Sequence, residues 1–312
     1  MTHSPENRPV VGRFAPSPTG PLHIGSLVAA VGSYVMAKRA GGLWLVRMED
    51  LDRPRVVPGM ADDILRTLET LGFAWDGPVL RQSSRDEAYE AVLSRLLAEG
   101  HAYPCGCSRA EIARTASAPH DGDVEPVYPG TCRGGLSPGK TARSFRVRVG
   151  EEETVFHDLF LGEQRFDLAT ACGDFVVKRA DGLFAYQLAV VVDDAAQGVT
   201  QVVRGADLLS STPRQILLQR LLGCDSPVYG HLPLVTGPGS AKLSKRDNAV
   251  SLTGGGDQQP SASALLCAAL RFLGQRLPLD LETAPPAEVL AWGVTRFDPS
   301  LVPCSSAPLS IS

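Results

Sequence analysis

The segment between residues 9 and 48 carries the pattern that most restricts the fold of this chain. Pro9–Ala15 (PVVGRFA) has the apolar character of a strand that enters a Pro/Gly-rich loop. Gly25–Arg39 is a mostly apolar helical segment, Gly41 and Gly42 end it, and Leu43–Met48 (LWLVRM) is a second buried strand. Strand, helix and strand in this order form a βαβ unit, so the sequence predicts an α/β fold with a parallel sheet.

Further periodic segments follow along the chain. The apolar runs LAVVVDD and VTQVVRG, between Leu183 and Val203, are typical of buried strands. Thr253–Ser263 is a Gly/Gln/Pro/Ser linker, and the tail after residue 292 has no clear structure. Helices are predicted at Ala61–Leu71, Arg85–Glu99, Pro213–Leu222, Ala264–Leu273 and Pro286–Trp292.

The segment His101–Val149 differs in character from its surroundings. It is rich in Cys, Gly, Pro and Arg, and Thr115–Pro126 is predicted to be a flexible loop. We interpret it as an insertion between two halves of a nucleotide-binding fold. The predicted division is residues 1–100, first half; 101–180, insert; 181–252, second half; 253–312, linker and short helical region.

Charge and cysteine usage exclude some classes of protein. The net charge of −4 argues against coating nucleic acid through bulk positive charge. Seven cysteines, an odd number, do not indicate a disulfide framework, so we expect a reducing cytoplasm. Met1–Arg8 lacks the apolar core of a secretory signal. Phe14–Ala37 is uncharged, but its prolines and glycines would expose backbone to lipid, so no membrane partner is expected.

The loop Pro16–Ser26 (PSPTGPLHIGS) has the features of an anion site. A strand that feeds a Gly/Pro-rich loop and opens a helix presents free backbone N–H groups to a phosphate. His23 stands where the helix begins, and its ring can donate a hydrogen bond to a phosphate. Gly25 lets a flat ligand such as adenine approach the backbone. A purely structural role for His23 is the alternative.

A basic segment, Lys242–Arg246 (KLSKR), forms a second candidate phosphate contact. It follows Gly237, Gly239 and Ser240, which favour a mobile loop that closes over a triphosphate. A solvated basic turn is the alternative when the segment is taken alone. The two segments together, in this order, predict an ATP site.

Three cysteines suggest a metal. Cys105 and Cys107 are one residue apart and Cys132 follows later, which supplies three soft ligands for a tetrahedral ion. His101 and His120 are conceivable fourth ligands. Three buried cysteines beside a turn are the alternative. The densest basic run of the chain lies in the same region and is only suggestive of nucleic acid: Arg133, Lys140, Arg143, Arg146 and Arg148.

Four blocks of the sequence resemble the class I aminoacyl-tRNA synthetases. PSPTGPLHIGS and KLSKR are similar to the two signatures of that class. Arg47–Pro54 (RMEDLDRP) and Asp193–Gln215 (DDAAQGVTQVVRGADLLSSTPRQ) resemble its glutamate-specific branch. One departure is Ser26, where the general signature has a second histidine; glutamate and glutamine enzymes commonly carry a small residue there.

The resemblance implies a fold and a reaction. The fold is a Rossmann-type catalytic domain split by a zinc-bearing α+β insert, with a short helical C-terminal stem. The amino-acid carboxylate attacks the α-phosphate of ATP, aided by Mg²⁺, while His23 and Lys245 stabilise the phosphate charge. ATP contacts are expected from Pro16, His23, Gly25, Ser26, Lys242, Ser244 and Lys245.

The same resemblance implies the site for L-glutamate. Arg13 supplies the cation for the side-chain carboxylate, and Glu49 takes the ammonium. Structural alternatives are an ion pair of Arg204 with Asp207 and a core position for Tyr186. The full set of implied glutamate contacts is Arg13, Phe14, Ala15, Pro16, Ser17, Glu49, Tyr186 and Arg204.

The resemblance also suggests the acceptor. The segment after Arg246 is too short for a helical anticodon-binding region, so the chain resembles the branch that lacks one. Those enzymes activate glutamate without tRNA and transfer it to the queuosine base at the wobble position of tRNA(Asp). They carry a C-x-C…Y-x₃-C site, which implies one structural Zn²⁺ on Cys105, Cys107, Tyr128 and Cys132. We expect a monomer. The alternatives are a compact glutamyl-tRNA synthetase that charges the tRNA 3′ end and a non-catalytic tRNA-binding relative.

Overall fold

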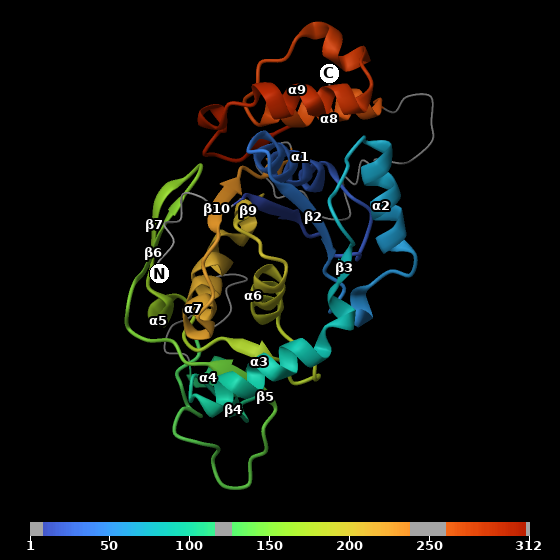
Figure 1. Ribbon diagram of the computed structural model, residues 1–312. Coiled ribbons are helices and arrows are strands. Elements are labelled where there is room, and N and C mark those ends of the chain that lie inside the picture. Colours follow the sequence, from blue (N-terminus) through green and yellow to red (C-terminus); the bar gives the residue numbers. More distant parts are fainter. Residues whose placement is uncertain (1–8, 116–126, 238–259, 310–312) are drawn as a thin grey trace.

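The first half of the chain forms a parallel β-sheet joined by a helical crossover. The computed structural model describes residues 9–115, 127–237 and 260–309 (Figure 1). β1 (Val11–Phe14) pairs in parallel with β2 (Leu43–Met48), and β2 pairs in parallel with β3 (Leu80–Arg81). α1 (Ile24–Arg39) connects β1 to β2. The predicted βαβ unit is confirmed.

The second half continues the same layer. β9 (Gln201–Gly205) pairs in parallel with β10 (Val228–Leu232), which pairs in parallel with β6 (Thr154–Asp158). β7 (Gly162–Phe166) closes this sheet antiparallel to β6. The two halves meet at β1 and β9, where the Thr200 N–H donates to the Val11 carbonyl over 3.0 Å. The strand order therefore reverses between β1 and β9, the place where open α/β sheets bind ligands.

α1 is enclosed by the rest of the molecule. It packs closely on the sheet, because a Cβ at Gly12 would lie 2.9 Å from the Ala37 Cβ and one at Gly32 would lie 2.5 Å from Leu232 Cδ1. On its other side lie α8 (Ala262–Phe272) and α9 (Pro286–Arg296), seen at the top of Figure 1. This burial explains the lack of charge between residues 14 and 37. Within the described ranges, no helix combines the length and apolar character needed to cross a bilayer.

One predicted strand is a helix. The run LAVVVDD lies in α6 (Tyr186–Ala196), not in a strand, whereas VTQVVRG contains β9 as predicted. Every residue from Gln187 to Asp194 is buried. A helix that is covered all round has no polar face, so its sequence lacks the 3.6-residue periodicity that distinguishes it from a buried strand.

The predicted insert contributes to two sheets. β4 (Ala102–Cys105), β5 (Ser144–Val147) and β8 (Val176–Lys178) form a small antiparallel sheet at the lower end of Figure 1. Two short helices accompany it, α4 (Arg109–Thr115) and α5 (Leu168–Ala171). β6 and β7 also fall within residues 101–180, yet they extend the main sheet through β10. Only part of the predicted insert therefore stands apart from the catalytic fold.

The remaining helices lie close to their predicted positions. α2 (Met60–Thr70), α3 (Asp86–Ala98) and α7 (Thr212–Leu222) cover the catalytic half, and α8 and α9 are the two predicted C-terminal helices. The tail is more ordered than the sequence indicates, because β12 (Ala307–Pro308) pairs in parallel with β11 (Val235–Thr236). The loop Thr115–Pro126 and the linker Thr253–Ser263 fall largely outside the described residues.

Candidate active site

The loop after β1 is held open at the carboxyl end of the sheet. The Glu49 N–H donates to the Pro16 carbonyl over 2.9 Å, and the Val57 N–H donates to the Pro18 carbonyl over 3.0 Å. His23 is the N-cap of α1, since its Nδ1 accepts from the Ser26 N–H over 3.3 Å. In the neutral ring the proton is therefore on Nε2. A Cβ at Gly25 would lie 3.1 Å from His23 Cε1, so the glycine leaves room for this ring.

Two arginines and two carboxylates meet beside that loop. Arg13, on β1, donates from Nε and Nη2 to Asp194 of α6 over 3.2 and 3.4 Å. Arg47, on β2, donates from Nη1 to Asp194 over 2.7 Å and from Nη2 to Glu49 over 3.4 Å. Arg13 is 3% exposed and Arg47 is fully buried. Among the described residues, Nη1 of Arg13 has no hydrogen-bond partner, so it can serve a ligand.

Burial and charge set the ionisation of this cluster. Burial would raise the pKa of Asp194, but Arg13 and Arg47 together hold it below its usual value, so Asp194 stays anionic. Burial raises the pKa of Glu49, and the opposing charges of Arg47 and Arg13 do not fully offset it. A cationic ligand beside Glu49 would therefore favour its charged form.

A second polar cluster lies on the β9 side of the place where the strand order reverses. Tyr186 begins α6, and its hydroxyl accepts from Arg204 Nη1 over 3.2 Å. Arg204 is buried on β9 and donates from Nη2 to Thr212 Oγ1 over 2.7 Å. Its Nε donates to His231 Nε2 over 3.2 Å. These partners replace Asp207, which the sequence offered as the alternative.

The other predicted site residues divide into two groups. Phe14 is buried and its ring stacks on Trp44 at 6.2 Å, so its side chain belongs to the core and only its backbone faces the loop. Ala15, Pro16 and Ser17 follow directly, and the Ser17 side chain is exposed. Lys242, Ser244 and Lys245 lie outside the described residues.

The three cysteines gather as predicted. Their sulfurs all lie within 4.8 Å of one another, with Cys107 and Cys132 at 3.6 Å. The Tyr128 hydroxyl lies 3.3 Å from Cys105 Sγ and 3.6 Å from Cys107 Sγ. The described residue His101 is not in this group; its Nε2 lies 3.8 Å from Glu99. His120 lies outside the described residues.

The spacing of these four groups fits a tetrahedral ion. With bonds of about 2.3 Å to sulfur and about 2.1 Å to oxygen, ligand atoms around zinc stand roughly 3.6–3.8 Å apart. The separations of Cys107 from Cys132 and from Tyr128, both 3.6 Å, match that range, the Cys105–Tyr128 separation is slightly shorter, and all three sulfurs lie within 4.8 Å of one another. The Cys105 thiol already has its pKa lowered to about 7: burial alone would raise it, but hydrogen bonds, chiefly from Tyr128, prevail. A bound cation would lower the pKa of all four groups further.

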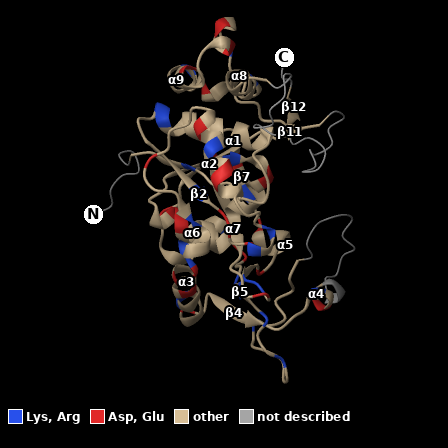
Figure 2. Ribbon diagram, turned by 90° about the vertical axis from the view of Figure 1, so that its right-hand side faces the viewer, with Lys and Arg blue, Asp and Glu red and all other residues tan. Residues whose placement is uncertain are grey.

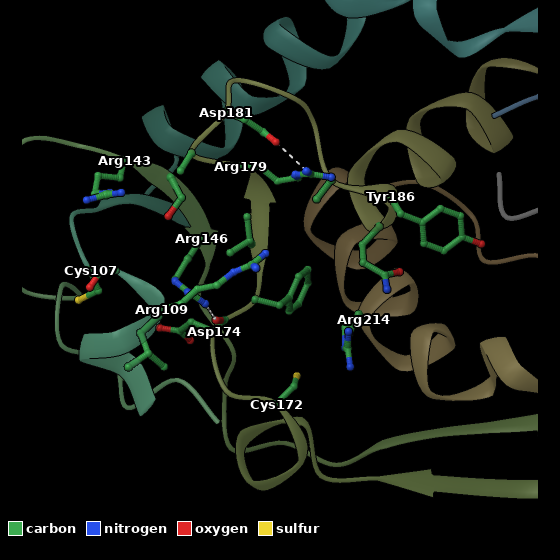
Figure 3. A pocket seen from close by; sticks show the side chains of 18 of the residues that line it. Cys107, Arg109, Arg143, Arg146, Cys172, Asp174, Arg179, Asp181, Tyr186 and Arg214 are labelled. Atoms are coloured by element: carbon green, nitrogen blue, oxygen red, sulfur yellow. Dashed lines mark hydrogen bonds and ion pairs between the residues drawn. The ribbon is translucent and has the colours of Figure 1, made fainter. Parts of the chain in front are cut away.

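A cavity of about 1370 Å³ connects the two regions (Figure 3). Tyr186 and Gln187 of α6 line one side and Cys107 and Ile112 line the other. Arg146 donates a hydrogen bond to the backbone carbonyl of Asp174, and Arg179 donates one to the Asp181 carboxylate. Figure 2 shows basic residues along β5 and along the segment that precedes it. The cavity is lined by six arginines, Arg55, Arg109, Arg143, Arg146, Arg179 and Arg214, against three aspartates.

Sequence reasoning missed Asp194, Asp158, Thr212 and His231, which are all buried. Asp194 reaches Arg13 across 181 residues of sequence, so no local pattern pairs them. The one available signal was the pair of aspartates at the end of LAVVVDD. Two charges that close an apolar run are buried only when they have partners.

Comparisons with known proteins point in one direction. Residues 9–277 match the family described as tRNA synthetases class I (E and Q), catalytic domain. The chain is 71% identical over 304 residues to the glutamyl-Q tRNA(Asp) synthetase of Geobacter sulfurreducens, covering 97% of each chain. It is 57% identical to the protein of the same name from Dechloromonas aromatica, over 96% of this chain and 98% of that protein.

A solved structure gives the same result for the fold. The glutamate tRNA ligase from Elizabethkingia meningosepticum, crystallised in complex with its amino acid, superposes with a TM-score of 0.79 at 28% identity. The match covers 97% of this chain and 68% of that chain.

Proposed function

Because this chain belongs to the class I tRNA synthetases of the E and Q type, we propose that it activates L-glutamate with ATP and transfers it to the queuosine base of tRNA(Asp). The observation that carries the first step is the buried cluster at the carboxyl ends of β1 and β9. There Arg13 and Arg204 offer cations while Glu49 offers a carboxylate. The near full-length similarity to glutamyl-Q tRNA(Asp) synthetases supports the second step.

The cluster suits a ligand with two carboxylates and one ammonium. Nη1 of Arg13 binds the side-chain carboxylate of glutamate, and Glu49 accepts from the ammonium. Tyr186 and Arg204 make the two further contacts, and the backbone from Phe14 to Ser17 borders the ligand. Asp194 keeps Arg13 in place from behind.

ATP lies along the loop Pro16–Ser26. His23 donates from Nε2 to a phosphate, while the N-terminus of α1 adds the backbone N–H of Gly25; Ser26, whose N–H is held by His23 Nδ1, contacts ATP through its hydroxyl. A glutamate carboxylate oxygen attacks the α-phosphorus, the bond to the bridging oxygen breaks, and pyrophosphate leaves. Lys242, Ser244 and Lys245 would neutralise the departing charge. Mg²⁺ would supply further neutralisation when bound with ATP.

The activation of glutamate and its transfer to tRNA can be tested separately. Wild-type protein with glutamate and ATP should exchange labelled pyrophosphate into ATP without added tRNA. Labelled glutamate should then pass to tRNA(Asp) that contains queuosine, and periodate oxidation of the tRNA 3′ end should not prevent it. Transfer lost on periodate oxidation would establish the compact 3′-charging enzyme instead. No exchange with glutamate or with any other amino acid would establish a non-catalytic relative.

The cysteine cluster would hold one structural zinc ion. Cys105, Cys107, Cys132 and the Tyr128 oxygen supply the four ligands, which tie β4 to the chain around residue 130. We expect the Cys132→Ser variant to lose the zinc that wild-type protein retains, measured as metal per chain by atomic absorption. Tyr128→Phe should keep zinc with lower affinity, because three thiolates remain. Cys304→Ser, an exposed cysteine elsewhere, is the control and should bind like wild type. Full zinc in Cys132→Ser would contradict this assignment.

The arginine-lined cavity would receive the tRNA loop that carries the queuosine base, because the cavity leads from the insert to Tyr186. Arg109 and Arg143 are exposed at its rim and would contact phosphates. Replacing either with alanine should weaken tRNA binding uniformly across tRNA sequences and reduce its salt slope by about 1. Exchange without tRNA should not change. Arg165→Ala, on the exposed β7, is the matched control. An unaltered salt slope in both rim variants would place the tRNA elsewhere.

We also infer a cytoplasmic monomer in which the chain divides as predicted, except that β6 and β7 of residues 101–180 belong to the main sheet. All seven cysteines are free, as in a reducing compartment. The helices α8 and α9 would form the stem behind the catalytic domain. Sedimentation of the purified protein at two concentrations would reveal any assembly.

A further inference from the structure

Four buried polar residues, Arg204 among them, are joined by hydrogen bonds, and the Thr212 hydroxyl lies within 3.0 Å of His231 Nε2 as well as of Arg204. Asp158, His231 and Thr212 are each fully buried, and Arg204 is 4% exposed. They come from three strands and a helix: β6, β10, α7 and β9. Such a set is costly to bury unless every member is hydrogen-bonded.

The partners fix the direction of each hydrogen bond. His231 Nε2 faces Arg204 Nε at 3.2 Å, and a guanidinium only donates, so Nε2 carries a lone pair. His231 Nδ1 lies 2.6 Å from Asp158 Oδ2, and a carboxylate only accepts, so Nδ1 carries the proton. The ring is therefore neutral with a defined tautomer. Burial, opposed by Asp158 and aided by Arg204, lowers the pKa of His231 and agrees with that state.

Asp158 is anchored in turn by the backbone. Its Oδ1 accepts from the N–H groups of Phe160, Leu161 and His231 over 3.0, 3.1 and 3.1 Å. This leaves Oδ2 for the imidazole. The carboxylate cannot rotate without breaking the turn between β6 and β7, so the ring is held in one orientation.

The other side of Arg204 is equally fixed. Nη2 donates to Thr212 Oγ1 over 2.7 Å, while Nη1, with two N–H groups, donates one hydrogen bond to Tyr186 over 3.2 Å. Among the described residues, no acceptor takes the second N–H of Nη1. Nη1 lies beside the Tyr186 hydroxyl, and Tyr186 lines the cavity.

We propose that Asp158 and His231 are positioning residues that hold the Arg204 guanidinium, so that one N–H of Nη1 is presented to a substrate carboxylate. This inference rests on the proposed function, since it takes Arg204 as a glutamate contact. A long arginine side chain without these partners would sample several rotamers, and each binding event would have to order it. The pair therefore acts on amino-acid affinity and not on ATP.

The test compares KM values in pyrophosphate exchange. His231→Leu removes the acceptor for Arg204 Nε and should raise the KM for glutamate at least about tenfold, with the KM for ATP changed less than about twofold. His231→Gln, whose Oε1 can take the place of Nε2, should restore most of the affinity. Asp158→Asn should raise the same KM by a smaller factor. Because asparagine has the shape of aspartate, this variant still provides a test if His231→Leu does not fold. Gln275→Met is the control for a buried polar loss far from Arg204.

The outcomes separate the possibilities. Equal rises in both KM values, or no rescue by glutamine, would show that His231 only supports the fold and would overturn the proposal. An unchanged glutamate KM in Asp158→Asn and His231→Leu would do the same. If wild-type protein exchanges with another amino acid, the proposed function fails; the same comparison with that amino acid then still tests the positioning of Arg204.

Discussion

Replacing Asp194 with leucine should lower the free energy of unfolding by about 3–5 kcal/mol, because it leaves two buried arginines without their shared anion. Arg13 and Arg47 both donate to Asp194, and all three side chains are at most 7% exposed. The lowered pKa of Asp194 shows that the pair of cations outweighs the effect of burial. Urea unfolding followed by tryptophan fluorescence measures the change, since Trp44 is fully buried in the same half.

An exposed ion pair provides the comparison. Asp86 accepts from Arg53 over 2.7 Å, but both side chains are more than half exposed. Asp86→Leu should therefore change stability by less than about 1 kcal/mol. A similar small change in Asp194→Leu would mean that the two arginines find other partners or water, and would refute the central role given to Asp194.

Replacing Arg13 with methionine should reduce kcat/KM for glutamate by about 10²- to 10³-fold, which corresponds to about 3–4 kcal/mol. Methionine keeps the apolar length of the side chain and removes the cation that we assign to the substrate carboxylate. Asp194 retains Arg47 as a partner, so stability should suffer less than in Asp194→Leu. Pyrophosphate exchange at varied glutamate and at varied ATP measures the effect.

Arg85 supplies the matched control for this variant. It donates from Nε to Asp193 over 3.1 Å, on the neighbouring aspartate of α6, but it lies outside the site. Arg85→Met should leave the KM for glutamate unchanged. If Arg13→Met behaved like Arg85→Met, Arg13 would be a structural partner of Asp194 and not the cation that binds the substrate carboxylate.

These variants test whether the adjacent residues Asp193 and Asp194 have different roles. Asp193 accepts from Gln82, Tyr89 and Arg85, whereas Asp194 accepts from Arg13 and Arg47. Neighbours on a helix point about 100° apart, so one aspartate ties α6 to α3 and the other faces the site. The proposed glutamate site is therefore built on a helix that is fixed from behind.

Several features were predictable from the sequence because they are local. The βαβ unit follows from residues 9–48, where periodicity and glycines mark each element. The cysteine cluster and its neighbouring tyrosine were also accessible, since Cys105 and Cys107 share one strand end and Tyr128 precedes Cys132 by four residues. The positions of Lys242, Ser244 and Lys245 stay a prediction, as does the role of each proposed glutamate contact.

The sequence by itself determined the α/β class, the loop between β1 and α1 and the types of side chain available to a ligand. Only the tertiary structure decided how those side chains are held. The pattern of LAVVVDD could not show that it is a helix, because the fold covers it on all sides and leaves it no polar face, and its two aspartates acquired partners from distant segments. Asp158 and His231 meet Arg204 only because β6, β10 and β9 lie next to each other in the sheet. Pairings of this kind depend on packing between remote segments, and local sequence preferences carry no record of them.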